Sequence, residues 1–293
     1  MSVGWWGPLA TAGWLLAPRP VAAQAPIGPP WDAVGRILQS PATLTGGYYR
    51  YGFPRRDLVV RVGDVVIAPA VALGAWIGFS GDPTDATAMG DLVVTSGELA
   101  PVLQELERQG VPITAIHNHL VGEQPSITYI HFHAEGDALD LARRLDQALA
   151  RTGAPRPVVP AAPQPVTIDT ALVFQTLGLR GRASGAVAQV STVLVPGPVT
   201  VHGRTVTPML GYASPINLQA VGPSRAVATG DFAVLDEKVA ALLRALTTHG
   251  ITATAVHSHL IGETPALSYI HFWADGPLDQ VTRGLRAAMD AAR

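Results

Sequence analysis

The sequence is organised by an internal repeat with a period of 140 residues. Between Gly110 and Gly136, 15 of 27 positions carry the same residue as the position 140 further along. Self-similarity of this kind indicates a duplicated structural unit. The most alike stretch covers residues 115–133 and returns at 255–273, so the structure that it forms is expected twice.

Each copy of this stretch is predicted to form two strands joined by a turn near residues 122–126, which include a glycine and a proline. Side chains alternate between the two faces of a strand, so His117 and His119 share one face and His131 and His133 share one face. If the hairpin is centred at residue 124 or 125, His117 lies opposite His131 or His133, and Tyr129 joins the same surface.

The other face of the predicted hairpin is apolar apart from Asn118. It carries Ile116, Leu120, Ile130 and Phe132. A shift of one residue in the pairing would bury the histidines and expose these side chains, so the apolar face favours the stated register. We therefore expect the histidine face to point away from the helices of its repeat.

The rest of the first repeat mixes helices and strands. Strands are predicted at 48–53, 58–62, 65–67, 75–79 and 89–94, and helices at 32–39, near 98–110 and at 137–150. Thr95 and Glu98 have the spacing of a capping box. The order strand-helix-strand-strand-helix from residue 89 is that of most of a ferredoxin-like unit, with residues 75–79 as the missing strand.

The chain is predicted to contain two tandem repeats separated by a linker. Residues 26–153 form the first repeat, and residues 154–166, which include five prolines, form a semi-rigid connection. Residues 167–293 form the second repeat. We expect an α+β fold in which each repeat has an antiparallel sheet covered by helices, and in which a pseudo-twofold axis relates the repeats.

The N-terminus has features of an export signal. An apolar run of about 13 residues is too short to span a bilayer, which needs roughly 20, and Ala23-Gln24-Ala25 fits a signal-peptidase site. Residues 1–25 are therefore predicted to be a signal peptide, leaving a mature chain without a transmembrane segment. Because the sequence contains no cysteine, we expect a soluble periplasmic or extracellular protein without a lipid anchor. The formal charge of −2 and the absence of a basic run argue against nucleic acid as a partner.

Several of these motifs resemble those of a known family. Gly-Asp-Leu-Val before a helix, His-Asn-His-Leu-x-Gly-Glu-x-Pro and Tyr-Ile-His are similar to motifs of the LppY/LpqO-like bacterial envelope proteins, a tandem domain of unknown function. The resemblance covers both repeats. It implies export and duplication, and it leaves the biochemistry open.

The histidine face predicts a metal site. Neutral imidazole is a common ligand of zinc, copper, iron and nickel, and residues i and i+2 on a strand are about 6.5–7 Å apart, close enough to share one ion. The candidate ligands are His117, His119, Glu123, His131, His133, His257, His259, Glu263 and His271. The expected cofactor is a divalent transition metal, with zinc as the first choice.

Other readings of these residues remain open. The carboxylates Glu123 and Glu263 are equally suited to accept backbone N–H groups at the turn. Tyr129, Tyr269 and Trp273, the last replacing His133 in the second copy, are expected at the wall of a shared cleft or in the core. Two further acidic residues, Asp91 and Asp231, recur before a strand, and we expect them to cap a turn or strand.

Two functional classes follow. In the first, the protein binds metal, either for metal-dependent hydrolysis or for metal carriage. In the second, it is a non-catalytic envelope binding module whose histidines are structural. The partner is an unspecified small molecule or envelope component, and no catalytic residue is assigned. We expect the two histidine faces to form one composite cleft, the alternative being two separate sites joined by the linker.

Overall fold

The computed structural model describes residue 1 and residues 28–293, so the predicted signal peptide lies almost wholly outside the described part of the chain. The elements of the first repeat are α1 (Pro29–Leu38), β1 (Ala42–Thr45), β2 (Tyr48–Pro54), β3 (Arg61–Val62), β4 (Val65–Val66), α2 (Pro69–Ala72), β5 (Gly74–Asp82), β6 (Asp85–Thr95), α3 (Ser96–Arg108), β7 (Ile113–His117), β8 (Glu123–Gln124), β9 (Ile127–Gly136) and α4 (Ala138–Leu149).

The second repeat has the same order. Its elements are α5 (Thr170–Leu177), β10 (Gly181–Ser184), β11 (Val187–Thr192), β12 (Thr200–Val201), β13 (Arg204–Thr205), α6 (Pro208–Gly211), β14 (Ser214–Ala220), β15 (Arg225–Leu235), η1 (Asp236–Lys238), α7 (Val239–Thr248), β16 (Thr252–His257), β17 (Glu263–Thr264), β18 (Leu267–Pro277) and α8 (Leu278–Ala291). Residues 154–166 contain no helix or strand.

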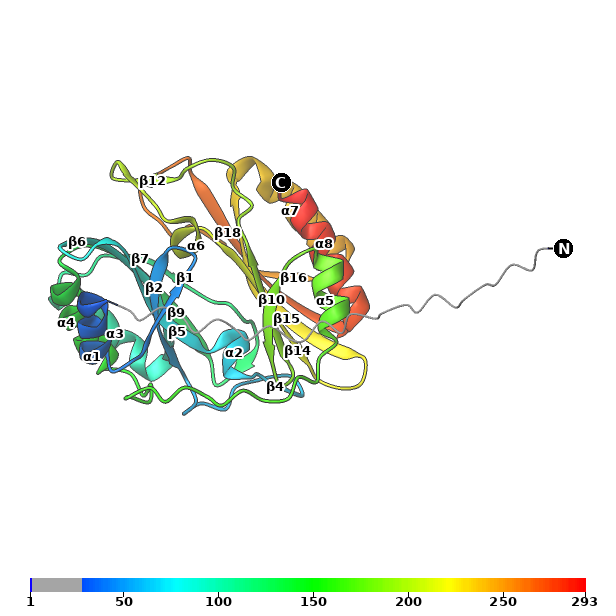
Figure 1. The fold of residues 1–293 in the computed structure, drawn as a ribbon, viewed down its shortest axis with the longest axis horizontal. Coiled ribbons are helices and arrows are strands. Elements are labelled where there is room, and N and C mark those ends of the chain that lie inside the picture. Colours follow the sequence, from blue (N-terminus) through cyan, green and yellow to red (C-terminus); the bar gives the residue numbers. More distant parts are fainter. Residues whose placement is uncertain (2–27) are drawn as a thin grey trace.

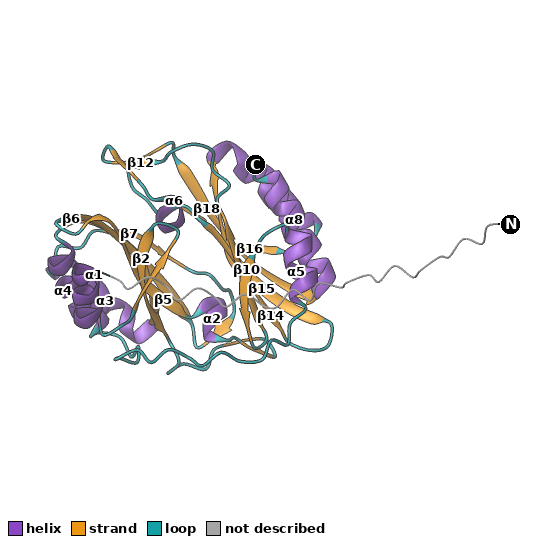
Figure 2. Ribbon diagram, viewed as in Figure 1, coloured by secondary structure: helices purple, strands orange, loops and turns teal. Residues whose placement is uncertain are grey.

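Each repeat is built on a six-stranded antiparallel sheet. The strand orders are β1-β2-β5-β6-β9-β7 and β10-β11-β14-β15-β18-β16, which are equivalent. The longer helices of each repeat lie on the outer side of its own sheet, and the inner faces of the two sheets point toward each other, with the short helices α2 and α6 between them (Figures 1 and 2). The predicted α+β class with two tandem antiparallel sheets is confirmed.

The ferredoxin-like element order predicted for residues 75–150 is also present. β5 pairs with β6 on the side away from β9, and so supplies the strand that residues 75–79 were predicted to add to the ferredoxin-like unit. It is not an edge strand, because β2 and β1 extend the sheet beyond it. Neither β1 nor α2 was predicted from the sequence, and the predicted strand 58–62 is reduced to the two residues of β3.

Local sequence signals account for the element boundaries around the site. The side chains of Thr95 and Glu98 form the predicted capping box, which begins α3 directly after β6. In the hairpin strand β9, residues Ile130 to Ala134 are all buried. Both faces are covered because one packs on the helices and the other on the second repeat.

The predicted register of the hairpin was wrong. His117 pairs with Tyr129, and His131 pairs with Ala115 after a bulge in β7. The connection between the strands is longer than a tight turn, because β8 leaves the hairpin and pairs with β3 in a small separate sheet. Ile116, predicted to pack on the helices, is 52% exposed since β7 is an edge strand.

The two repeats pack against each other reciprocally. α2 contacts β14 of the second repeat, and the equivalent α6 contacts β5 of the first. Gln219 accepts a hydrogen bond from the backbone N–H of Ala68 (2.9 Å) and donates one to the carbonyl of Val66 (2.8 Å). A cluster of buried apolar residues drawn from both repeats fills part of the contact. This arrangement is the pseudo-twofold packing expected for a duplication.

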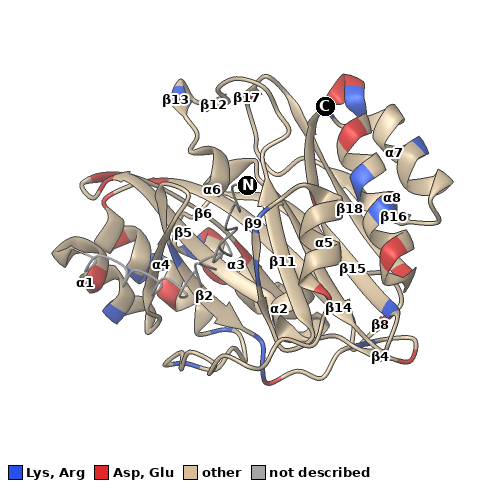
Figure 3. Cartoon of the chain, turned by 45° about the vertical axis from the view of Figure 1, so that its right-hand side comes forward, with Lys and Arg blue, Asp and Glu red and all other residues tan. Residues whose placement is uncertain are grey.

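Charged residues are more frequent on the helices than along the strands. Figure 3 shows Lys, Arg, Asp and Glu on α1, α4 and α8 and on connecting loops, with fewer of them along the strands. In the described part of the chain, no helix combines the length and apolar character needed to cross a membrane.

Candidate metal centre between the two repeats

An aspartate and a histidine lie side by side on the inner face of each sheet. Asp91 on β6 pairs with His131 on β9, and Asp231 on β15 pairs with His271 on β18. Paired residues of antiparallel strands project to the same face. The side chains meet: Asp91 Oδ1 lies 3.1 Å from His131 Nδ1, and Asp231 Oδ1 lies 2.8 Å from His271 Nδ1.

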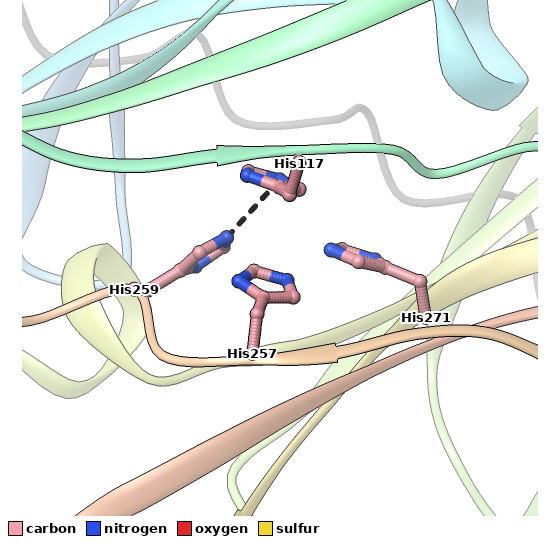
Figure 4. Close-up of side chains that lie close together, drawn as sticks. All are labelled: His117, His257, His259 and His271. Carbon is pink, nitrogen blue, oxygen red and sulfur yellow. Dashed lines mark hydrogen bonds between the residues drawn. The ribbon is translucent and has the colours of Figure 1, made fainter.

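The remaining histidines come from the ends of β7 and β16 and from the connections after them. His117 Nε2 lies 3.2 Å from His119 Nε2 and 3.3 Å from His259 Nε2 of the other repeat. Figure 4 shows His117 on a strand of the first repeat facing His257, His259 and His271 of the second. The Thr254 hydroxyl on β16 donates a hydrogen bond to the His119 carbonyl (2.8 Å), which ties the second repeat to the connection after β7.

Three overlapping groups of side chains have ligand atoms within 4.8 Å of one another: His117, His257, His259 and His271; Asp91, His131 and His259; and Asp231, His271 and His119. The second and third groups are related by the 140-residue period. Each takes an aspartate and a histidine from one repeat and a histidine from the other. The cluster is therefore composite, as expected for one cleft rather than two independent sites.

Burial favours the neutral form of His117, His119 and His259. It lowers the pKa of His117 to about 2, against the opposing effect of the Asp91 carboxylate. Burial, together with the neighbouring histidines, also lowers the pKa of His119 and His259 well below the usual range for histidine. A neutral imidazole has a lone pair for a metal, so no proton has to leave these rings before they coordinate.

Four ring nitrogens of the cluster are buried without a hydrogen-bond partner in the described part of the chain. They are His117 Nδ1, His131 Nε2, His257 Nε2 and His271 Nε2. An unpaired buried polar atom costs about 1–3 kcal/mol, and natural proteins rarely leave several in one place. For His131 and His271 the unpaired nitrogen is the one opposite the aspartate. The donor set therefore fits a group that accepts imidazole lone pairs.

Three of the predicted ligands, Glu123, His133 and Glu263, and the predicted wall residue Trp273 lie away from these groups. Glu123 Oε1 accepts the backbone N–H of Ile127 (3.0 Å), and Glu263 Oε1 accepts that of Leu267 (3.1 Å), so both carboxylates hold the connection after the histidines. His133 lies 3.5 Å from Glu135 and stacks at 6.0 Å on the exposed His202. Trp273, its counterpart in the second repeat, is half-buried and packs on the core of the first repeat.

The two tyrosines line the cluster without offering it a hydroxyl. The Tyr129 hydroxyl donates to the carbonyl of Ala72, and the Tyr269 hydroxyl to that of Gly211 (2.8 Å). Their rings pack on histidines: Tyr129 stacks on His119 at 3.7 Å, and Tyr269 lies tilted against His259 at 4.3 Å. Burial raises the pKa of Tyr129 above its usual value. These contacts orient the imidazoles.

The expected role of Asp91 and Asp231 as turn or strand caps was wrong. Both lie within long strands and are buried, each 6% exposed. Burial by itself raises the pKa of Asp91, but the charge and hydrogen bond of His131 lower it below the usual range. The sequence did carry a signal for this buried position, since an aspartate recurs at the 140-residue period inside an otherwise apolar strand. A carboxylate buried in such a strand needs a partner.

A cleft of about 490 Å³ reaches the cluster from between the two sheets. Its wall includes Asp91, His119, His131, Asp231 and His259, together with residues of β2, β10 and β11. A small molecule entering this cleft would meet the cluster directly.

Comparison with known proteins identifies both repeats. Residues 32–151 and 171–291 each match the family described as a Domain of Unknown Function (DUF1259). No curated protein matches the chain.

Similar solved structures include the ligand-free regulatory subunit of aspartate kinase from Thermus thermophilus, with 15% identity, a TM-score of 0.22, and coverage of 73% of this chain and 99% of that one. EtuB from Clostridium kluyveri has 13% identity, a TM-score of 0.21, and coverage of 87% and 90%, respectively. At these TM-scores neither structure informs the fold or function of the chain.

Proposed function

We propose that this chain, which belongs to the family described as a domain of unknown function (DUF1259), binds a divalent transition metal in a composite site between its two repeats. The observation that carries the proposal is the set of four buried, unpaired imidazole nitrogens, contributed by both repeats and converging on one cluster. Imidazole with carboxylate is a donor set that suits zinc, copper, iron and nickel.

The spacing of two pairs of ring nitrogens fits zinc. In a tetrahedral zinc site with zinc–nitrogen distances of about 2.0–2.1 Å, ligand nitrogens are about 3.3–3.4 Å apart. His117 Nε2 lies 3.3 Å from His259 Nε2 and 3.2 Å from His119 Nε2. Hydrogen bonds between imidazoles would also give these two distances, and this is the reading in which the histidines are structural. That reading leaves His131 Nε2 and His271 Nε2 buried and unpaired.

The aspartates support coordination by orienting the histidines. A metal-binding histidine usually donates its other ring N–H to a carboxylate or carbonyl, which fixes the tautomer. Asp91 Oδ1 contacts Nδ1 of His131, and Nδ1 of His271 lies 2.8 Å from Asp231 Oδ1 and 3.2 Å from the Gly230 carbonyl, so Nε2 of each ring is left as the lone-pair nitrogen. The same relation in both repeats makes the arrangement a property of the fold.

The cleft favours a reaction at the metal over metal carriage alone. A site with three protein ligands and an open position can activate water for hydrolysis, and a cleft that reaches the cluster gives a substrate access to that position. We infer metal-dependent hydrolysis of a small molecule as the activity class. The motifs similar to LppY/LpqO-like proteins support export through residues 1–25, with an envelope location for the substrate.

Isothermal titration of zinc into untagged, chelator-treated protein tests the proposal. His117→Ala and His259→Ala, one from each repeat, should each weaken zinc binding by at least about tenfold, since each removes a ligand atom. His133→Ala is the matched control and should leave the affinity within about twofold. Unchanged binding in the variant that combines His117→Ala with His259→Ala would eliminate the site.

A further inference from the structure

The cleft that reaches the histidine cluster is lined elsewhere by three arginines. Arg50 on β2, Arg180 just before β10, and Arg182 on β10 all contribute to its wall. They come from both repeats, as the histidines do. One cleft therefore joins a basic region to the candidate metal centre.

The sheet register places Arg50 on the same face as the cluster. Arg50 pairs with Gly78, Gly78 with Met89, and Met89 with His133, two residues from His131 along β9. Cross-strand partners, and residues two apart on a strand, share a face. β2 and β9 are three strand spacings apart, which is about 14 Å at about 4.8 Å per spacing.

Both strand arginines are held in place by neutral partners. The Arg50 guanidinium carbon lies 4.8 Å above the Trp76 ring. Arg182 Nε donates to Gln189 Oε1 (3.0 Å), and Gln189 Nε2 donates to the carbonyl of Ala70 in the first repeat (2.8 Å). Preorganised guanidinium groups bind anions with little further loss of side-chain entropy.

Neither strand arginine has a carboxylate within ion-pair distance among residues 28–293, where many other arginines do. The pKa of Arg182 is lowered, first because part of the side chain is desolvated and then because of the positive charge of Arg50. Two such cations facing one cleft favour an anionic guest, and guanidinium geometry suits carboxylate or phosphate.

We propose that the substrate is an organic anion whose carboxylate or phosphate is held by Arg50 and Arg182 while its other end lies at the histidine cluster. The separation of the two regions calls for a guest on the order of 10 Å long, judged from the strand spacing. The contact at the histidine cluster rests on the proposed metal site, whereas the contact with Arg50 and Arg182 rests on the arginines alone.

The test is titration calorimetry of zinc-loaded and zinc-free protein with two probes, a hexose 6-phosphate and adipate, which separate phosphate from carboxylate recognition. At least one probe should bind. Arg50→Gln and Arg182→Gln should each raise its Kd by about tenfold or more, the loss expected for a charge-assisted hydrogen bond. Arg50→Lys should retain part of the affinity, and the exposed Arg61→Gln, outside the cleft, should retain all of it.

Zinc content, measured on the same samples, separates this inference from the proposed function. Arginine variants with wild-type zinc content and weakened probe binding support the inference. Binding of neither probe, or a Kd unchanged by both arginine substitutions, overturns it whatever the zinc content. If wild-type protein holds no zinc, the proposed function fails, and the arginine contact is judged on the zinc-free titrations.

Discussion

Replacing Asp91 by asparagine tests how the cluster is oriented. The substitution keeps the shape of the side chain and removes the negative charge that contacts His131 Nδ1 at 3.1 Å. Asparagine can present its NH₂ group to the ring, which would place the proton on Nε2 and remove the lone pair meant for the metal. Loss of such an orienting partner typically lowers metal affinity 10- to 100-fold, or about 1.4–2.7 kcal/mol.

Competition titration of zinc against a chromophoric chelator measures this change. The equivalent Asp231→Asn should have an effect no larger than this, because Asp231 Oδ1 lies 2.8 Å from His271 Nδ1, which also lies 3.2 Å from the Gly230 carbonyl. The exposed Asp85→Asn, which removes an ion pair with Arg204, serves as the control. Zinc affinity within about twofold of wild type in both buried variants would refute the orienting role.

Three further substitutions test packing and electrostatics outside the ligand set. Burial by itself raises the pKa of Glu98, but hydrogen bonds from Arg55 and from backbone N–H groups lower this pKa below its usual range. The stability that the Glu98 carboxylate contributes is therefore present above the unfolded pKa and is lost as pH falls. Glu98→Gln should therefore lower the free energy of unfolding by about 1.5–3 kcal/mol at pH 7, and denaturant titrations should show this difference shrinking toward pH 3; a constant difference would exclude the charge as its source. Gly90→Ala would place Cβ 2.1 Å from the carbonyl oxygen of Trp76, so this substitution should lower the melting temperature by several degrees or prevent folding. A wild-type melting curve would contradict the close approach of β5 to β6. Tyr269→Phe leaves a buried carbonyl without its hydroxyl partner, so chemical denaturation should show a free energy of unfolding lower by about 1–3 kcal/mol. Zinc affinity should stay within a few-fold of wild type. Loss of zinc binding at wild-type stability would instead assign the hydroxyl to the metal site.

The sequence was sufficient for the features that depend on local periodicity. The repeat, the strands β6 and β9, and the capping box that begins α3 follow from short-range patterns. The grouping of His117 and His131 on one face also followed, because the observed register differs from the predicted one by an even number of residues, which leaves each side chain on its predicted face.

The features that depend on distant pairing were out of reach. β8 pairs with β3, some 60 residues earlier in the chain, and this pairing lengthens the hairpin connection and moves His117 opposite Tyr129. Likewise, the placement of His119 beside Asp231 depends on how the two sheets dock. No pattern within one repeat carries that information, because the contacts lie between repeats.

Anomalous diffraction at the zinc edge from crystals of the zinc-loaded protein is the most direct test of metal binding between the repeats. We expect a peak within about 2.0–2.2 Å of imidazole nitrogens from both repeats, among His117, His257, His259 and His271 or in one of the two groups that contain Asp91 or Asp231. A peak whose ligands all come from one repeat, or no peak at the cluster in protein that has been given zinc, would contradict it.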